Sequence, residues 1–157
     1  MDLMGPVEVA SLAGKLYIFV IVDDFSRYTW VSFLKEKSET FTFFKMLYMH
    51  FKNVYNKCVK RIRSDHGREF ENQFFSLFCD KKGISHEFLA PITPQQNVIA
   101  ERKNRTLQEM DRVMLSSMNL SKRLWAEAIN TACHIINRVY LRRGTQSTPY
   151  EILNGKT

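Results

Sequence analysis

Two acidic residues, Asp65 and Glu101, stand where carboxylates could act together on a bound cation. Thirty-five residues lie between them, and each occupies the junction of a regular element and a turn. Asp65 follows the run 59–63, whose alternation of apolar and polar residues is typical of a half-buried strand. Glu101 lies in the first turn of a predicted amphipathic helix, because apolar residues recur at helical spacing over 107–114. A strand-end aspartate and a helix-start glutamate can therefore converge.

Converging carboxylates repel one another, so one must take up a proton unless a cation offsets the repulsion. Hard oxygen ligands in small number, completed by substrate phosphates, suit Mg²⁺. Paired ions can hold both the attacking and the leaving oxygen of a phosphodiester. Cationic side chains flank both acids and would supply the positive field that a polyanionic substrate requires: Arg61, Arg63, Arg68, Arg102, Lys103 and Arg105. Spacing alone leaves a structural alternative open, in which Asp65 begins a turn and Glu101 complements the helix dipole.

The composition describes a basic, globular chain. Its 157 residues fit one domain, and a hydrophobic content of 45% with 12 Phe is ample for a core. The excess of 23 Lys+Arg over 16 Asp+Glu gives a net charge of +7, which favours an acidic partner such as nucleic acid. The 3 cysteines are widely spaced and indicate neither disulfides nor a zinc site, so a reducing, intracellular compartment is expected. The longest apolar run, 16–22, is too short to span a bilayer, and no membrane association is expected.

The acids are expected to be positioned by a mixed α/β sheet covered by helices. Strands are predicted around Asp2 and at 15–22, 28–34, 59–63 and 84–89, the second and third forming an antiparallel hairpin. Helices are predicted at 38–54, 71–82 and 99–118, followed by a helix with a broad apolar stripe over 124–136. In such a sheet ligands gather beside strand ends, where Asp2, Asp65 and Glu101 could all reach.

The sequence resembles the integrase core of copia-type LTR retrotransposons within the retroviral integrase superfamily, particularly plant elements. The resemblance covers nearly the whole chain and is carried by six ordered segments: DLMGP, IVDDFSRYTWV, IRSDHGREFEN, APITPQQNVIAERKNRTLQEM, LWAEAINTACHIINR and TPYEILNGK. It implies an RNase H-like fold with a five-stranded mixed sheet. Residues 1–118 would form the catalytic core, and 119–157 a helical extension of the same domain.

The resemblance also implies a catalytic triad that binds two Mg²⁺ or Mn²⁺ ions. Matched residue by residue, the triad is Asp2 of DLMGP, Asp65 of SDHG and Glu101 of AERKN. Asp23 and Asp24 are rival carboxylates near a long strand, but aspartate also favours hairpin turns, and the family pattern places the active residue before Gly-Pro. Asp2 is therefore the preferred third ligand.

The implied activity is 3′-end processing followed by DNA strand transfer, with element ends and target DNA as partners and the nucleus as the place of action. Arg105 lies one turn beyond Glu101 and is expected to contact a phosphate near the scissile bond. The other residues expected to contact DNA are Lys103, Arg102, Arg68, Asn97, Gln96 and Gln95. For the last three, a merely polar loop is the alternative, and His66 could contact the site although a lone histidine beside a turn is more often structural.

Two further functions remain open. Asp2 almost begins the chain, Val98 stands where the family commonly has Gly, and Asp111 lies on the apolar stripe of its helix, where an unpaired charge is costly. These departures favour a catalytically inactive fragment that keeps the fold, DNA binding or self-association. A nuclease that cuts RNA in hybrids is a third candidate, opposed by the TPQQN and AERKN segments. A homodimer or higher oligomer is expected, with the stripes over 107–118 and 124–136 as either interface or core.

Overall fold

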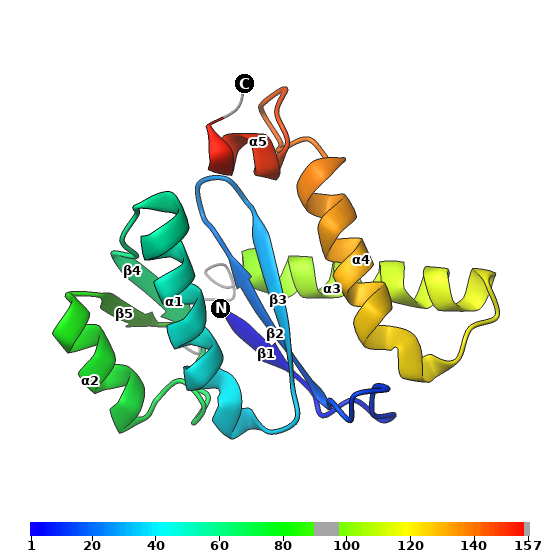
Figure 1. The fold of residues 1–157 in the computed structure, drawn as a ribbon, viewed down its shortest axis with the longest axis horizontal. Coiled ribbons are helices and arrows are strands. Elements are labelled where there is room, and N and C mark those ends of the chain that lie inside the picture. Colours follow the sequence, from blue (N-terminus) through cyan, green and yellow to red (C-terminus); the bar gives the residue numbers. More distant parts are fainter. Residues whose placement is uncertain (90–97, 156–157) are drawn as a thin grey trace.

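The structure is a computed structural model that describes residues 1–89 and 98–155. Strands and helices alternate along the chain after an initial run of three strands, as the sequence predicts (Figure 1). The strands are β1 (Asp2–Met4), β2 (Tyr17–Val22), β3 (Thr29–Leu34), β4 (Arg61–Ser64) and β5 (Ser85–Phe88). The helices are α1 (Thr40–Tyr55), α2 (Gln73–Lys82), α3 (Val98–Ser117), α4 (Trp125–Arg138) and α5 (Pro149–Asn154).

The strands pair in both senses, which confirms the mixed α/β architecture. β1, β2 and β3 form an antiparallel sheet in which Asp2 lies opposite Val20, and β4 pairs with β5 in parallel. The expectation of one continuous five-stranded sheet is wrong in detail, because the hydrogen bonding divides the strands into two sheets. β1 is short, and one contact across the seam between the two sheets is the Met1 amino group donating to the Arg63 carbonyl at 2.6 Å.

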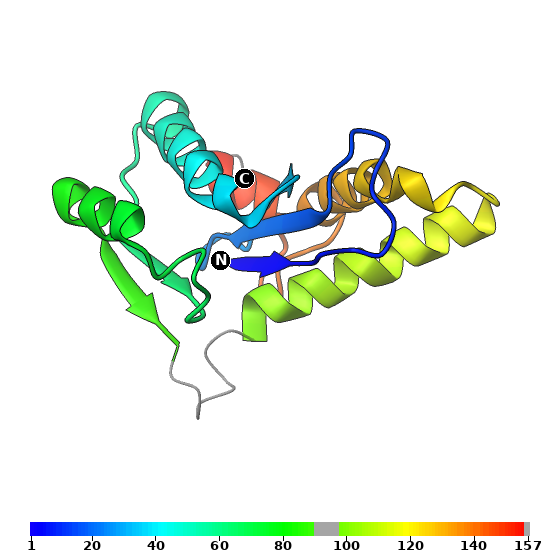
Figure 2. The same cartoon turned by 90° about the horizontal axis from the view of Figure 1, so that it is seen from below.

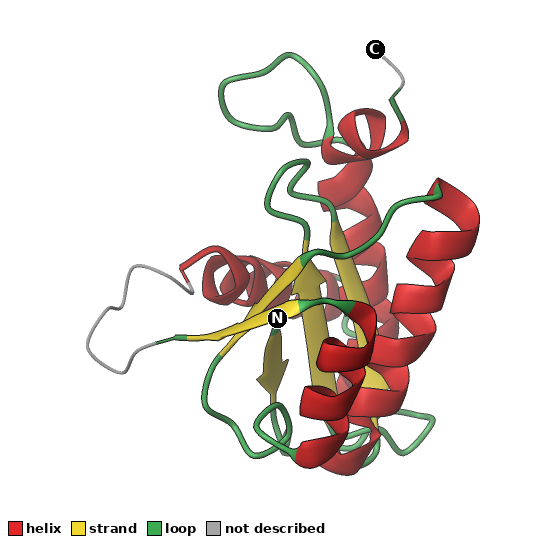
Figure 3. Cartoon of the chain, turned by 90° about the vertical axis from the view of Figure 1, so that its left-hand side faces the viewer, coloured by secondary structure: helices red, strands yellow, loops and turns green. Residues whose placement is uncertain are grey.

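Helices cover both faces of the three-stranded sheet, because consecutive residues of a strand point to opposite sides. Phe19 packs with Phe44 of α1 and Phe75 of α2 in one core cluster. The neighbouring Ile18 and Val20 belong to a second cluster beneath α3 and α4. Figures 2 and 3 show this layered arrangement, with strands lying between helices.

The apolar stripes of α3 and α4 face this second cluster. Leu107, Trp125, Ile129 and Ile136 are all buried there, and Met110 packs against them. The interpretation of these stripes as core is therefore confirmed for these residues, whereas Met118 at the end of the first stripe is 69% exposed. Among the helices within residues 1–89 and 98–155, none combines the length and apolar character that a bilayer crossing requires.

The turns beside the strands follow from local side-chain chemistry. The Asp23 carboxylate accepts hydrogen bonds from the Ser26 amide at 2.7 Å and the Ser26 hydroxyl at 2.6 Å, which closes the β2–β3 hairpin. The side chain of Asn72 accepts from the amides of Phe74 and Phe75 and so begins α2. Gly83 ends that helix with a φ of 64°, because glycine takes the left-handed conformation without strain.

Candidate active site

Asp2 lies at the start of β1, beside the helix that carries Glu101. Its Oδ2 accepts a hydrogen bond from the Nδ2 of Asn104, which is 3% exposed on the inner face of α3. α3 packs across β1 and β2, so Asn104 and Leu107 point toward the sheet. This contact joins the first strand to α3, one turn beyond the position of Glu101.

The surroundings of Asp2 disfavour its ionised form. Burial raises its pKa most, the negative charge of Asp65 raises it further, and the charge of Glu101 adds to the same direction. The Met1 amino group and the Asn104 hydrogen bond lower the pKa in part. The three acids that the sequence singled out therefore share one electrostatic environment, in which a cation would relieve their mutual repulsion.

Asp65 follows β4 directly and is exposed, with one carboxylate oxygen held by the turn. Its Oδ1 accepts from the Gly67 amide at 3.1 Å. A Cβ at Gly67 would lie 2.8 Å from the carboxyl carbon of Glu69 and 3.0 Å from Asp65 Oδ1. A side chain at position 67 would therefore displace the side-chain ends of Glu69 and Asp65, and the hydrogen bond from the Gly67 amide orients the Asp65 carboxylate.

The chemistry of these donors fits a hard divalent cation, because all three predicted ligands are carboxylates. Within residues 1–89 and 98–155, however, no three His, Cys, Asp or Glu side chains are grouped closely enough to hold a metal ion. Asp65 and Glu101 lie near enough to Asp2 to raise its pKa, but the three acids are not arranged as a closed set of ligands. Binding of a cation would require the carboxylates to draw together.

The cationic residues predicted to contact DNA divide into two groups. Arg102 and Arg105 are exposed on α3, with Arg105 one turn beyond Glu101, and Arg68 is exposed in the loop after Asp65. Lys103 differs from its prediction because it is partly buried: burial lowers its pKa, nearby Cys133 raises it, and Arg27 lowers it. Its side chain faces α4 rather than open solvent. Gln95, Gln96 and Asn97 lie outside the described residues.

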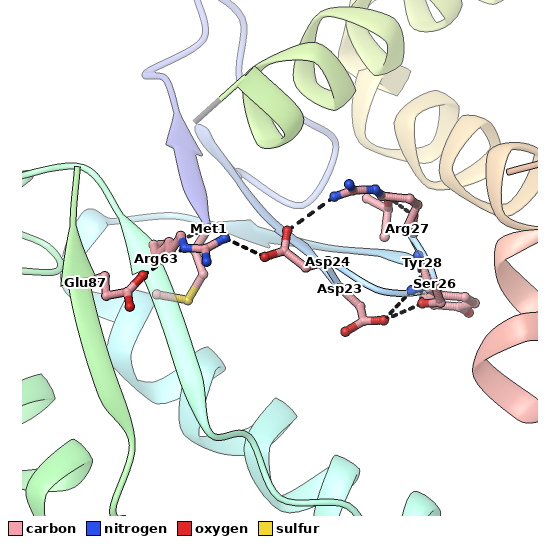
Figure 4. A network of polar contacts seen from close by, with 9 residues as sticks. Met1, Asp23, Asp24, Ser26, Arg27, Tyr28, Arg63 and Glu87 are labelled. Carbon is pink, nitrogen blue, oxygen red and sulfur yellow. Dashed lines mark hydrogen bonds and ion pairs between the residues drawn. The ribbon is translucent and has the colours of Figure 1, made fainter. Parts of the chain in front are cut away.

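An ion-pair network crosses the seam between the two sheets (Figure 4). Asp24 accepts from Arg63 at 2.6 Å and from Arg27 at 3.2 Å, and Arg63 also donates to Glu87 at 2.9 Å. Glu87 pairs in addition with Arg61 at 3.0 Å. Arg61 and Arg63 are thus partly neutralised and contribute less to the positive field than the sequence implied.

The rival carboxylates of the hairpin are both engaged in structure. Asp23 holds the turn and Asp24 is paired with two arginines, as Figure 4 also shows. The structural interpretation of His66 is likewise favoured, since its Nδ1 lies 3.3 Å from Glu71 Oε2 and its ring stacks on Phe88 at 5.2 Å. Because Asp23 and Asp24 are engaged in this way, Asp2 remains the predicted third ligand of the metal ions.

Sequence reasoning missed Asn104. The signal was present, because asparagine is a poor residue for a helix interior and position 104 falls on the buried stripe with Leu107. A polar side chain at such a position needs a buried partner. In this chain the partner is the Asp2 carboxylate.

Comparisons with known proteins give a consistent result. A family model described as the integrase core domain matches residues 1–94. The retrovirus-related Pol polyprotein of transposon TNT 1-94 from Nicotiana tabacum is 42% identical over 137 residues, which cover 87% of this chain and 10% of that protein. The Pol polyprotein of transposon RE2 from Arabidopsis thaliana is 33% identical over 151 residues, covering 94% of this chain and 10% of the relative. The chain therefore spans about a tenth of the length of these curated relatives.

Solved structures show the same fold. A simian T-cell lymphotropic virus intasome in complex with the PP2A regulatory subunit B56 gamma matches with a TM-score of 0.74 and 21% identity, covering 97% of this chain and 53% of that chain. The HTLV-2 integrase catalytic core domain in complex with magnesium, in a trimeric form, matches with a TM-score of 0.66 and 24% identity, covering 96% and 94%. Its dimeric form matches with a TM-score of 0.64 and 25% identity, covering 97% and 94%. The RNase H-like fold of retroviral integrase cores is thereby established for this chain.

Proposed function

The chain belongs to the integrase core domain family, and from that premise we propose that it acts as a polynucleotidyl transferase on DNA. The reaction would trim the 3′ ends of element DNA and then join the freed 3′-OH to target DNA, which places the active protein in the nucleus. The observation that carries the proposal is the hydrogen bond from Asn104 to Asp2, which brings the acid of β1 to α3 one turn from Glu101. Burial raises the pKa of Asp2 most and the charges of Asp65 and Glu101 raise it further, and carboxylates held near one another are suited to binding cations.

In this proposal Asp2, Asp65 and Glu101 hold two magnesium ions, or manganese in their place. When bound, the ions supply a Lewis acid that lowers the pKa of an attacking water or 3′-OH and stabilises charge on the phosphate. Asn104 fixes one oxygen of Asp2 by donating to it, and the Gly67 amide does the same for Asp65. The chain thereby orients two of its three ligands by hydrogen bonds from residues that need not touch DNA.

DNA would be held by the exposed arginines around these acids. Arg105 and Arg102 on α3 and Arg68 after Asp65 are free of the ion pairs that occupy Arg61 and Arg63 within the described chain. Phosphate contacts by such residues position a duplex without reading its sequence. Lys103 would contribute through its charge rather than by direct contact, and Gln95, Gln96 and Asn97 remain predicted contacts to bases or sugars.

Self-association is also proposed, as a homodimer or a higher oligomer. With the stripes of α3 and α4 buried, the remaining exposed apolar side chains on α1 are Met46, Met49 and Val54, and those on α2 are Phe74 and Leu77. Clusters of exposed apolar residues mark interaction surfaces more often than isolated ones do. In sedimentation velocity, the sedimentation coefficient is expected to rise with protein concentration. A monomer at every concentration would exclude the oligomer.

One observation favours the second candidate, an inactive fragment. The three carboxylates do not form a closed ligand set within the described residues. Such a fragment would still bind DNA through its arginines and would retain its fold. The two candidates differ in whether phosphodiester chemistry occurs at all.

A disintegration assay separates the candidates. The chain is incubated with a branched DNA that mimics the joined product, in Mg²⁺ or Mn²⁺, and release of the branch is measured. Activity is expected in the unaltered chain and a loss of at least about a hundredfold in Glu101→Gln. Glu109→Gln, which alters an exposed acid farther along α3, serves as the matched control and should retain activity. Activity that survives Glu101→Gln contradicts the assignment, and cleavage confined to the RNA of a hybrid would instead identify a hybrid nuclease.

A further inference from the structure

The hydroxyl of Ser64 occupies a buried position directly before Asp65. Ser64 ends β4 and is 0% exposed. Its Oγ makes two contacts: it donates to the Asp65 carbonyl at 3.1 Å and lies 2.8 Å from Nε2 of His86. A buried hydroxyl is costly unless its donor and acceptor groups are both satisfied, and here both are.

The tautomer of His86 sets the direction of this short chain of hydrogen bonds. A serine hydroxyl has one proton, which can point to the Asp65 carbonyl at 3.1 Å or to His86 Nε2 at 2.8 Å. When the proton points to the Asp65 carbonyl, His86 donates to Ser64 Oγ from Nε2. The arrangement runs from imidazole N–H to hydroxyl to main-chain carbonyl, and it requires the Nε2-protonated tautomer of neutral His86.

His86 is held in place by its own surroundings. It lies on β5, and its ring packs on Phe88 at 4.1 Å and on Phe75 at 5.9 Å between ring centres. Burial, with a smaller contribution from the charged amino terminus, lowers the pKa of His86 and favours its neutral form. The imidazole is thus held in a fixed position beside the end of β4.

The residue after Asp65 is fixed against the same strand. The His66 ring stacks on Phe88 at a centroid distance of 5.2 Å and an interplanar angle of 23°. Phe88 therefore packs against both histidine rings. Asp65 lies between Ser64, which contacts His86 of β5, and His66, which stacks on Phe88 of β5. β5 in turn leads toward the segment that precedes Glu101.

We propose that Ser64 and His86 are positioning residues for Asp65, an inference that rests on the proposed function. They hold the Asp65 carbonyl, and with it the direction in which the carboxylate leaves the main chain. Residues that orient metal ligands typically affect metal affinity or activity by about 10–100-fold, and a ligand misplaced by about 1 Å can cost about a hundredfold in rate. Neither side chain needs to touch DNA or metal to have this effect.

Substitutions of matched length test the proposal. The side-chain nitrogen of glutamine reaches the position of histidine Nε2, whereas that of asparagine reaches only the position of Nδ1. In the disintegration assay His86→Asn and Ser64→Ala should lower kcat about 10–100-fold with KM for DNA changed less than about twofold. His86→Gln should recover most of kcat. His134→Gln, which alters an exposed histidine on α4, is the control, and equal losses in the Gln and Asn variants overturn the proposal.

A second measurement does not depend on activity. The ¹⁵N NMR spectrum of the imidazole distinguishes the two neutral tautomers, and His86 should be protonated at Nε2 at neutral pH. A spectrum showing protonation at Nδ1 overturns the proposal. Because this spectrum is recorded on the unaltered chain, the test does not require any variant to fold. If the unaltered chain shows the expected tautomer but no disintegration activity, the hydrogen-bond chain stands and the proposed function fails.

Discussion

At the scale of single residues, Asn104 influences the protonation of Asp2. The Asn104 amide donates to Asp2 from a buried position on α3 and lowers the Asp2 pKa, against burial and the charges of Asp65 and Glu101, which raise it. A buried hydrogen bond to a charged group contributes about 1.5–3 kcal/mol. Asn104 therefore favours the ionised form that a metal site requires.

Replacement of Asn104 should weaken metal use. In Asn104→Ala the Asp2 carboxylate loses its donor, its pKa rises further, and we expect the Mn²⁺ concentration that supports half-maximal disintegration to rise about tenfold. Gln108→Ala is the matched control, because Gln108 is one turn farther along α3 and contacts Met4 of the same strand at 3.2 Å. An unchanged Mn²⁺ requirement in Asn104→Ala would show that the contact has no part in the site.

The sequence predicted Asp2, Asp65 and Glu101 through motif resemblance, and spacing alone supported only the last two. It placed Lys103 with the exposed arginines, whereas the structure partly buries it beside α4. A helical repeat can assign a residue to a face of a helix, but it cannot show where the boundary between packed and exposed faces falls. That boundary depends on how α3 crosses α4.

At the scale of elements, hydrophobic periodicity predicted the strands and the long helices because each has one clearly apolar face. α5 was missed although its capping signal is present: Thr148 and Glu151 form a capping box and Pro149 occupies the first turn. The helix is only 6 residues long, too short for a periodic pattern. The single sheet was mispredicted because strand pairing across β1 and β4 is a tertiary property.

Asp111 is a second polar residue, after Asn104, on the inner side of α3, as the sequence indicated for Asp111. Its Oδ1 is buried and has no hydrogen-bond partner within the described chain, and burial raises its pKa although Arg112 lowers it in part. Because the folded-state pKa lies above the ordinary value of 3.8, the ionised carboxylate destabilises the fold at neutral pH. This destabilisation is complete above the folded-state pKa and vanishes below the ordinary value.

Asp111→Leu should therefore stabilise the protein at pH 7. We expect the free energy of unfolding in urea to rise by about 1–3 kcal/mol, the scale of an unsatisfied buried polar group. The gain should shrink as the pH is lowered toward the ordinary carboxyl value. Glu109→Leu, at an exposed position on the same helix, should change stability by less than about 0.5 kcal/mol. A destabilised Asp111→Leu would mean that the carboxylate has a partner in solution.

At the scale of the whole molecule, two sheets meet at a seam where the acids gather. β1 and β4 approach each other at Met1 and Arg63, and the Asp24–Arg63–Glu87 network spans the same place. Its ion pairs are 38–61% exposed, so each is worth at most about 1 kcal/mol. These ion pairs therefore contribute little to holding the two sheets together at the seam.

The net charge of +7 predicts DNA binding that weakens as salt rises. The logarithm of the binding constant should fall linearly with the logarithm of salt concentration, and Arg105→Gln should reduce that slope by about 1. Lys45→Gln removes an equal charge from an exposed position on α1, across the sheet from α3, and should leave the slope unchanged. Equal slopes in the two variants would show that DNA does not lie along α3.

Calorimetric titration of Mn²⁺ into the chain tests the central claim most directly. The claim is that Asp2, Asp65 and Glu101 jointly bind divalent cations, which relieves the carboxylate repulsion that adds to burial in raising the Asp2 pKa. The account predicts saturable binding by the unaltered chain, and its loss in Asp65→Asn and in Glu101→Gln while Glu109→Gln still binds. An absence of binding, or binding of equal affinity in all four proteins, would contradict the account.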